Sequence, residues 1–354
     1  MFTQFIVKNF RCFSGLHLKD LSRVNLIAGK NNSGKTALLE AIHLHSYPRD
    51  CSLPFKINVS RGINEEKKFD SDSCLWLFHD KDGESEIEFR GQLQSTEERL
   101  LQMWFMDSVA LEERFPELSS KIRQVPRSPF GGGDGLLMLH AQAKEWDTYT
   151  IADPHSTGLG SIGSSILPWD GPSLFLPSSG RSPEEDTTAF SDLEQSNRQD
   201  EILPSLRILE PRLQRLAILL LAERPVIHGH IGLSSQVPVQ FMGEGIRRLL
   251  SILLAIHQAK GGNVLIDEIE NGLHHSVMVQ VWQAIADAAR RADAQVFATT
   301  HSYECIQAAN QAFAASQPYD LGLFRLDRMD GDIRVVAYNR NTLNTSIDMS
   351  LEVR

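Results

Sequence analysis

The sequence has few cysteines, no long hydrophobic run and no excess of positive charge. Its four cysteines are scattered along the chain: Cys12, Cys51, Cys74 and Cys305. They show no spacing typical of a metal site or a disulfide framework, which fits a reducing compartment. The longest apolar stretch, residues 216–222, is far too short to cross a bilayer. Residues 1–30 contain charged and polar breaks, unlike a signal peptide. We therefore expect a cytoplasmic protein without membrane contact.

Charge and size narrow the function classes further. The chain has 45 acidic and 35 basic side chains, for a formal net charge of −10. It therefore lacks a global basic footprint for nucleic acid, although a local basic face remains open. Its 354 residues, 42% of them hydrophobic, suffice for a globular core in one large domain or in one domain with an insert.

The most informative segment is residues 26–36, which read Leu-Ile-Ala-Gly-Lys-Asn-Asn-Ser-Gly-Lys-Thr. This matches the phosphate-loop pattern G-x-x-x-x-G-K-[ST], with an apolar, strand-like run before it and a helical pattern after it. Glycines let backbone N–H groups curl around phosphate oxygens, and the helix N-terminus adds positive potential. Lys35 is predicted to reach the outer phosphates and the Thr36 hydroxyl to hold Mg²⁺. The predicted ATP-binding residues are Gly29, Asn31, Asn32, Ser33, Gly34, Lys35 and Thr36.

A second motif points from nucleotide binding to hydrolysis. Residues 264–268 read Val-Leu-Ile-Asp-Glu, an apolar run that ends in two acids. This pattern is typical of a buried parallel strand that delivers carboxylates to the edge of a sheet. Asp267 is predicted to hold Mg²⁺ together with Thr36, and Glu268 to polarise the attacking water. Alone, the acids could be an ordinary end of a strand; the intact phosphate loop favours catalysis.

Residues 295–302, Gln-Val-Phe-Ala-Thr-Thr-His-Ser, form another apolar run with a polar tip. A lone histidine is more often structural than catalytic. His301, however, ends the strand that follows the Asp-Glu strand, where it can sense a γ-phosphate. The predicted catalytic residues are therefore Lys35, Glu268 and His301.

Residues 241–250, Phe-Met-Gly-Glu-Gly-Ile-Arg-Arg-Leu-Leu, open a long apolar helix. Two glycines before a helix make an anion site that can face a second nucleotide. This predicts nucleotide contacts for Gly243, Glu244 and Gly245, which we call the signature segment. A glycine turn that simply starts a core helix is the alternative.

The order of these motifs resembles the ABC-type ATPase heads of the SMC, RecF and OLD group. In that order the chain has the phosphate loop, a Gly-rich segment before a helix, the Asp-Glu strand, an Asn271-Gly272-Leu273 turn and a histidine switch. The N-terminal segment that contains Arg11 is similar too, and the resemblance implies a nucleotide contact for Arg11. The chain looks most like stand-alone prokaryotic OLD-like "AAA-family" ATPases, several of which serve in phage defence. The resemblance covers residues 1–45 and 236–354.

The sequence also departs from the family pattern. Met-Gly-Glu-Gly replaces the Leu-Ser-Gly-Gly-Gln of transporters, and Gln92 and Gln94 are weak candidates for the Q-loop glutamine. No long coiled coil interrupts the head. The chain ends about 50 residues after His301, so we expect a complete head without the nuclease (TOPRIM) domain of full-length OLD proteins.

The pattern and the resemblance predict an α/β fold. It is a P-loop NTPase with an ABC-type head, made of a mixed sheet and an antiparallel β subdomain. A helical lobe is inserted between the phosphate loop and the signature segment. The expected parts are 1–92 with Walker A, an inserted lobe at 93–222 with a Gly/Ser/Pro-rich loop at 154–188, and 223–354 with the signature, Walker B and histidine switch.

Local patterns give further expectations. Apolar residues at helical spacing predict helices within 95–123 and 189–222, and Gly131–Gly135 is expected to be a turn. Hairpins are expected at 76–91 around Asp82-Gly83, at 136–152, at 226–241 and around Asp330-Gly331. Two polar features are expected to face solvent, and each has an alternative function. The polar loop after 173–177 can approach the nucleotide. The side chains of Arg207, Arg212 and Arg215 can contact DNA or a partner.

These elements together predict an ATPase that uses ATP and Mg²⁺ and dimerises head to tail around two ATP molecules. Three uses of such a switch compete. One is a defence or stress module that controls a separately encoded effector protein, and the missing nuclease domain favours it. The second is a RecF-like repair ATPase that binds DNA directly, which the acidic balance disfavours. The third is a scaffold in which ATP holds the assembly together with little turnover.

Overall fold

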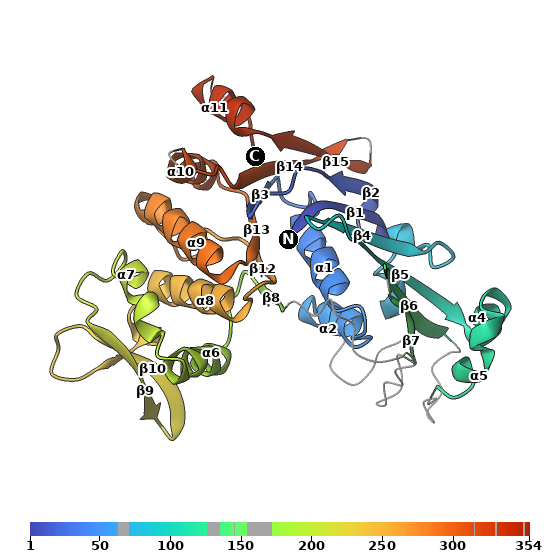
Figure 1. The fold of residues 1–354 in the computed structure, drawn as a ribbon, viewed down its shortest axis with the longest axis horizontal. Coiled ribbons are helices and arrows are strands. Elements are labelled where there is room, and N and C mark those ends of the chain that lie inside the picture. The colour runs from blue at the N-terminus through green and yellow to red at the C-terminus, as the bar shows by residue number, and fades with distance from the viewer. Residues whose placement is uncertain are drawn as a thin grey trace.

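The computed structural model describes residues 1–62, 71–125, 135–144, 146–153, 172–314, 316–329, 331–349 and 351–354. Within them the chain forms an α/β structure with two six-stranded sheets and one three-stranded sheet (Figure 1). Residues 131–134 of the expected Gly-rich turn and residues 154–171 of the expected loop lie outside the described residues. No helix in the described part of the chain is long and apolar enough to span a membrane.

The central sheet is mixed, as expected. Five neighbouring strands run parallel, and the sixth forms an antiparallel hairpin with the fifth. In spatial order they are β8 (Ser173–Leu176), β12 (Asn263–Ile266), β13 (Gln295–Thr300), β3 (Val24–Ala28), β14 (Leu321–Met329) and β15 (Asp332–Tyr338). The parallel strands are short apolar runs because helices cover both faces of the sheet. The β14–β15 hairpin confirms the one expected near residue 331.

Alternate residues of the central strands face two cores. Val264 and Ile266 point to a core shared with helices on one side, while Leu265 points to a core on the other side. Helix α1 (Lys35–Ser46) lies between the two large sheets, opposite the other helices (Figure 1). Those helices are α6 (Pro183–Gln195), α8 (Glu244–Gln258), α9 (Met278–Ala292) and α10 (Tyr303–Phe313).

The second six-stranded sheet is antiparallel throughout and confirms the expected β subdomain. In spatial order its strands are β2 (Phe13–Leu18), β1 (Phe2–Phe10), β4 (Ile87–Leu93), β5 (Glu98–Asp107), β6 (Gly135–Ala143) and β7 (Trp146–Ala152). The β6–β7 pair is the hairpin expected at 136–152. Short helices accompany this sheet: α2 (Leu53–Ser60), α3 (Ser71–Leu75), α4 (Ser108–Arg114), α5 (Ser119–Ile122) and the 3₁₀ turns η1 (His79–Lys81) and η2 (Pro116–Leu118).

The helix expected from residue 95 is wrong in its first part, because residues 98–107 form strand β5. Leu101 and Met103 face the core around α1, whereas Trp104 faces a small core with α4 and α5. A strand with apolar neighbours on both faces has no clear period of two, so its pattern can be taken for a helix. The hairpin expected around Asp82-Gly83 is also wrong: β4 pairs with β1 and β5, and Phe78 makes a single bridge with Phe10.

The segment 189–222 is helical in its first half alone. Helix α6 ends at Gln195, and α7 (Leu203–Leu206) is one turn long. Residues 215–221 then form β9, which pairs with β10 (Arg224–His230), so the expected helix is wrong there. Strand β10 also pairs with β11 (Val237–Pro238), which confirms the hairpin expected at 226–241. This small sheet projects from the body beside α6 (Figure 1).

The inserted segment does not separate cleanly from the head. Helix α6 begins at Pro183 with a capping box between Ser182 and Glu185, so the expected loop ends before residue 188. Strand β8, inside the segment 93–222, belongs to the central sheet. The proposed boundary at 222/223 falls in the β9–β10 turn, where Ala222 and Glu223 both have positive φ. Near the end of the chain, α11 (Arg340–Asp348) follows β15, and three further 3₁₀ turns complete the fold: η3 (Gln199–Glu201), η4 (Val239–Phe241) and η5 (His275–Val277).

Candidate functional site

The candidate site lies at the carboxyl ends of three adjacent parallel strands, β3, β13 and β12. The loop after β3 carries the glycines and Lys35, β12 ends before Asp267, and β13 ends before His301. Parallel strands bring their carboxyl ends to one edge, where α/β sheets bind ligands. The fold therefore brings together three of the motifs that are far apart in the sequence.

The phosphate loop needs both of its glycines. Gly34 has φ 92° and ψ 8°, and a Cβ there would lie 2.8 Å from Cys12 Sγ and 2.9 Å from a Phe13 ring carbon. A Cβ on Gly29 would lie 2.7 Å from the Leu326 carbonyl oxygen. A side chain at either position would force the loop or its neighbours to shift, so both positions require glycine. The helix α1 begins at Lys35, directly after Gly34, and its first N–H groups face the loop.

The Lys35 ammonium lies inside the loop. Its Nζ donates to the carbonyl oxygens of Gly29 at 2.7 Å and Lys30 at 2.9 Å. Burial lowers the pKa of Lys35, and the carboxylates of Asp267 and Glu268 oppose that effect. The position leaves the ammonium next to the space that the loop surrounds, where outer phosphate oxygens would bind.

Asp267 lies between two threonine hydroxyls. Thr36 Oγ1 donates to both carboxylate oxygens at 3.1 Å, and Thr299 Oγ1 donates to Oδ1 at 2.7 Å. The Thr299 hydroxyl also accepts from the Glu268 backbone N–H at 2.8 Å, so one side chain orients both acids. The sequence-based interpretation missed Thr299, although it precedes His301 by two residues on the same strand.

The Thr36–Asp267 pair fits Mg²⁺ by its chemistry. Both residues offer oxygen atoms, which this hard cation prefers, and the site lies beside the phosphate loop. In the described ranges, no group of three or more His, Cys, Asp or Glu side chains is arranged to hold a metal ion. Mg²⁺ usually takes one or two protein ligands and fills its shell with phosphate oxygens and water. The chemistry of Thr36 and Asp267 therefore fits a Mg²⁺ site, and their role as metal ligands stays a prediction.

Glu268 faces the cleft from a strained backbone position, with φ 47°. Asn271 Nδ2 donates to its Oε2 at 2.9 Å, and His301 Nδ1 lies 3.8 Å from its Oε1. Glu270 fixes the His301 backbone: its Oε1 accepts from the His301 N–H at 3.0 Å and lies 3.3 Å from His301 Nδ1. The structure thus places Glu268 and His301 side by side, with Asn271 and Glu270 as orienting residues that the sequence analysis had not assigned.

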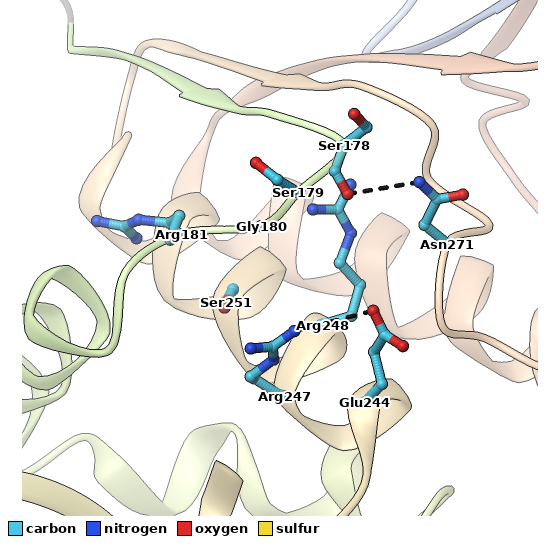
Figure 2. A pocket seen from close by; sticks show the side chains of 9 residues that line it. All are labelled: Ser178, Ser179, Gly180, Arg181, Glu244, Arg247, Arg248, Ser251 and Asn271. Carbon is cyan, nitrogen blue, oxygen red and sulfur yellow. Dashed lines mark hydrogen bonds and ion pairs between the residues drawn. The ribbon is translucent and has the colours of Figure 1, made fainter. Parts of the chain in front are cut away.

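Arg248, from the first turns of α8, holds the ends of two central strands. It is buried and donates to the carbonyl oxygens of Pro177 at 2.9 Å and Asp267 at 2.6 Å. Burial lowers its pKa, against the pull of nearby carboxylates, yet guanidinium stays charged. Figure 2 shows this side chain reaching from α8 toward the loop at Ser178. An arginine on the apolar face of the helix pattern is the sequence signal that could have revealed this contact.

A single cleft of about 890 Å³ contains the phosphate loop and both acids. Its lining comprises Arg11, Cys12, residues 31–37, Arg61, Trp76, Phe78, Asp80, Lys81, Asp267, Glu268 and Arg328. Arg11 lies there, as the resemblance implies, with its Nε 2.7 Å from Glu40 Oε2. Burial lowers the pKa of Arg11, and Glu40 opposes that effect. The resemblance had given no indication of Arg61, Trp76, Lys81 or Arg328.

The signature segment is separate from this cleft. Gly243 is exposed with φ 109°, and a Cβ there would meet no atom within 4 Å. Gly245 instead packs against the turn after β12 of the same chain, since a Cβ would lie 2.8 Å from the Gly272 carbonyl oxygen. Glu244 lines a different, small pocket with Ser178, Arg247 and Asn271 (Figure 2). Within one chain, the structure does not bring the signature segment to the phosphate loop.

The expected Q-loop glutamines lie elsewhere. Gln92 is on β4 and Gln94 in the exposed turn after it, and neither lines the cleft. The loop after β8 lies next to the end of β12 instead, and the Ser178 carbonyl oxygen accepts from Asn271 Nδ2 at 3.4 Å. This polar loop, expected to approach the nucleotide, lines the small pocket in Figure 2 rather than the cleft.

The arginines at 207–215 make local contacts. Arg207 Nε donates to the Leu213 carbonyl oxygen at 2.7 Å. Arg212 pairs with Glu210 at 2.9 Å, and Arg215 is exposed at the start of β9. Two of the three guanidinium groups thus have partners within the chain. This favours an ordinary solvent-exposed surface over a surface that contacts DNA or a partner.

Fold and site together define a P-loop ATPase with an ABC-type head. The family model described as "AAA ATPase domain" matches residues 1–124. The model described as "AAA domain, putative AbiEii toxin, Type IV TA system" matches residues 162–306. These matches cover the phosphate loop, the signature segment and strands β12 and β13. The chain is an ATP-hydrolysing enzyme.

Two curated relatives are similar to this chain. A protein named "ATP/GTP phosphatase" from Helicobacter pylori is 25% identical over 331 residues, which is 86% of this chain and 86% of that protein. A protein named "Uncharacterized protein MJECL10" from Methanocaldococcus jannaschii is 50% identical over 38 residues, or 11% of this chain and 17% of its own length.

Two solved structures share the fold. An SMC head bound to the C-terminal winged-helix domain of ScpA has a TM-score of 0.52 at 12% identity, with 97% of this chain and 99% of that chain covered. An SMC head from Pyrococcus furiosus with an extended coiled coil has a TM-score of 0.50 at 11% identity, with 99% of each chain covered. At this identity the likeness establishes the fold, which is that of an ABC-type head.

Proposed function

We propose that two copies of this chain form composite ATPase sites and use ATP as a switch. The observation that carries the proposal is the separation of the two half-sites. The phosphate loop and the acids line one cleft, whereas the signature segment lies outside it. Phe241, two residues before Gly243, is 75% exposed beside the signature segment. Aromatic side chains are enriched at protein interfaces, and the open backbone at Gly243 leaves room for a partner to approach.

The chemistry explains why one head is insufficient. Phosphoryl transfer requires charge neutralisation around the γ-phosphate and exclusion of water. Lys35 and the N-terminus of α1 supply positive charge from one side, and a second copy's Gly243 region would close the other side. Backbone N–H groups at the start of α8 would then face the γ-phosphate.

Metal binding, water activation and phosphate binding are assigned to residues of one chain. Thr36 and Asp267 would hold Mg²⁺, which would neutralise phosphate charge. Glu268, oriented by Asn271, accepts a hydrogen bond from the attacking water and draws away its proton. His301, 3.8 Å from Glu268, is placed to contact the γ-phosphate or the same water. Lys35 exchanges its loop carbonyl partners for outer phosphate oxygens.

The biological use we propose is control of a separately encoded effector in prokaryotic defence or stress. Two observations support it. One is the resemblance to stand-alone OLD-like ATPases. The other is the description of the matching family model as a putative AbiEii toxin of a type IV toxin–antitoxin system. The name of the Helicobacter pylori relative supports nucleoside triphosphate hydrolysis and adds GTP as a second substrate.

The RecF-like alternative has less support. Net charge is −10, and Arg207 and Arg212 already have partners within the chain. A DNA-binding face normally presents several unengaged basic side chains. A scaffold with little turnover is the other alternative, and a steady-state ATPase assay separates it from a working switch.

A subunit-mixing experiment tests the composite site. One subunit carries Lys35→Ala, which removes the phosphate-loop cation. The other carries Gly243→Trp, which projects bulk into open space at the signature segment. Each variant alone breaks both sites of a homodimer, whereas the heterodimer retains one intact site. We expect the mixture to regain activity that neither variant has alone, up to about a quarter of the parental rate if subunits exchange freely and the two sites act independently.

Gly261→Trp is the matched control for Gly243→Trp. Gly261 also has positive φ (74°), and a Cβ there would likewise meet no atom within 4 Å. It therefore also carries a positive-φ backbone cost, of about 1–3 kcal/mol, without touching the signature segment. We expect Gly261→Trp to remain active. Heterodimers confirmed by mass that show no recovered turnover would contradict independent composite sites.

A further inference from the structure

The nucleotide cleft has a second wall that the phosphate loop does not explain. Trp76, Asp80 and Lys81 line the cleft together with the loop. Trp76 is 49% exposed, and the Lys81 ammonium lies 3.9 Å from the centre of its ring. The cleft volume of about 890 Å³ is in the range of pockets that hold whole small-molecule ligands. A phosphate group alone needs much less.

This wall is fixed to the turn between β1 and β2, which carries Arg11. The Arg11 N–H donates to the Leu77 carbonyl oxygen at 2.8 Å, and His79 Nδ1 lies 3.0 Å from the Arg11 carbonyl oxygen. Phe78, next to His79, is buried and forms a bridge with Phe10. The exposed indole is therefore held at the cleft by buried neighbours on its own segment.

The backbone of this wall is unusual as well. Asp80 and Lys81 both have left-handed backbone conformations, with φ 49° and 58°. Lys81 N–H donates to the Phe78 carbonyl oxygen at 3.2 Å, and Asp82 N–H donates to the His79 carbonyl oxygen at 2.9 Å. Two successive non-glycine residues in this region are rare and cost stability. The turn places the Lys81 side chain over the indole and leaves the Asp80 carboxylate exposed.

We infer that Trp76 is the stacking platform for the purine base of the nucleotide whose phosphates bind at Gly29–Thr36. This inference rests on the proposed nucleotide function. An exposed indole in a cleft offers a π-face to any base, and base–aromatic stacking is worth about 1–3 kcal/mol. The Lys81 ammonium lies over one face of the indole and steadies the ring, so the base would stack on the opposite face.

The platform accepts both purines. Stacking does not distinguish adenine from guanine, because each has a planar ring of similar size. The Asp80 carboxylate can accept a hydrogen bond from an amino group, which adenine carries at N6 and guanine at N2. The Asp80 side chain lies 3.6 Å from His79 Nε2. Because it is 88% exposed, it has room to turn toward a base. We therefore expect similar affinities for ATP and GTP.

The test compares nucleotides with a ligand that has phosphates but no base. Dissociation constants for ATP, GTP and inorganic tripolyphosphate are measured by calorimetry for the parental protein, Trp76→Ala and Trp76→Phe. We expect Trp76→Ala to weaken ATP and GTP by about tenfold or more and to leave tripolyphosphate unchanged. Trp76→Phe keeps an aromatic face and should stay within about threefold of the parental protein. Val109→Ala, which shortens a 66% exposed side chain outside the cleft lining, is the control for removing exposed apolar surface.

A second readout does not depend on the fold of Trp76→Ala. ATP binding to the parental protein should quench tryptophan emission, and Trp76→Phe should lose that quench. Trp146→Phe, changed at a partly buried residue of β7 outside the cleft lining, should keep it. Unchanged ATP affinity in folded Trp76→Ala, or equal affinity of the parental protein for ATP and tripolyphosphate, would overturn the platform while the phosphate loop stands. A parental protein that binds neither ligand would overturn the proposed function itself.

Discussion

Asp267 and Glu268 are neighbours in sequence, yet their surroundings differ. Asp267 is buried and accepts hydrogen bonds from Thr36 and Thr299 on two different elements. The Glu268 side chain is 38% exposed and faces the cleft, with Asn271 on one oxygen. A carboxylate fixed by two hydroxyls suits a metal shell, and one that reaches a cleft suits water activation. The two environments therefore support the division of roles expected from sequence.

Glu268→Gln should separate binding from turnover. The amide keeps the shape of the side chain and its contact with Asn271 but cannot take a proton from water. We expect ATP affinity to stay within about threefold and kcat to fall by about 100-fold or more, the usual contribution of a general base. Steady-state phosphate release and ATP calorimetry measure the two effects. Glu184→Gln, an exposed change at the start of α6, is the control. Turnover at the parental rate would rule out Glu268 as the base.

At the scale of an element, helix α1 is notable for two histidines whose pKa is low. Burial lowers the pKa of both His43 and His45 to about 4. His45 Nε2 lies 2.9 Å from the Arg99 carbonyl oxygen, and His43 Nδ1 lies 3.3 Å from Ser173 Oγ. The helix that follows the phosphate loop thus packs on both large sheets through neutral imidazoles.

The free energy of unfolding should therefore fall in mild acid. Each histidine has a lower pKa folded than unfolded, so the unfolded chain binds more protons between about pH 6.5 and 4. Their contribution is fully present above pH 6.5 and is lost as pH falls through that window, up to about 3 kcal/mol per histidine. Urea midpoints at pH 7.5, 6 and 5 measure this loss. His43→Asn should flatten the pH dependence, whereas a matched change at exposed His274 should not. An equal slope in His43→Asn and the parental protein would contradict this account.

Two whole heads are needed in the proposed cycle, which predicts a dependence on protein concentration. Monomers hold a phosphate loop and a signature segment that do not share a cleft. Turnover per subunit should therefore rise with protein concentration and reach a plateau as dimers form.

Light scattering supplies the structural measurement for this prediction. Glu268→Gln with ATP should give about twice the mass of the nucleotide-free protein, because slow hydrolysis keeps the ATP-bound dimer populated. Lys35→Ala with ATP, which should not bind the nucleotide, is the control and should retain the nucleotide-free mass. Turnover per subunit that is constant at high dilution would contradict the dimer.

The sequence by itself predicted the residues of the candidate site. Gly29–Thr36, Asp267-Glu268 and His301 are local patterns, and each depends on a strand that ends in a polar tip. Short apolar runs bounded by such tips predict parallel strands, and parallel strands place their ends together. For this reason the phosphate loop, the acids and the histidine could be assembled before any coordinates.

Tertiary structure alone decided the surroundings of that chemistry. Strands β5 and β9 have apolar patterns that also fit helices, and they became strands because neighbouring strands pair with them. Thr299 and Arg248 contact partners far away in sequence, and Trp76 lines the cleft with the distant phosphate loop, which no local pattern encodes. The same holds for the separation of Gly243 from the phosphate loop, because distances between elements depend on packing across two cores.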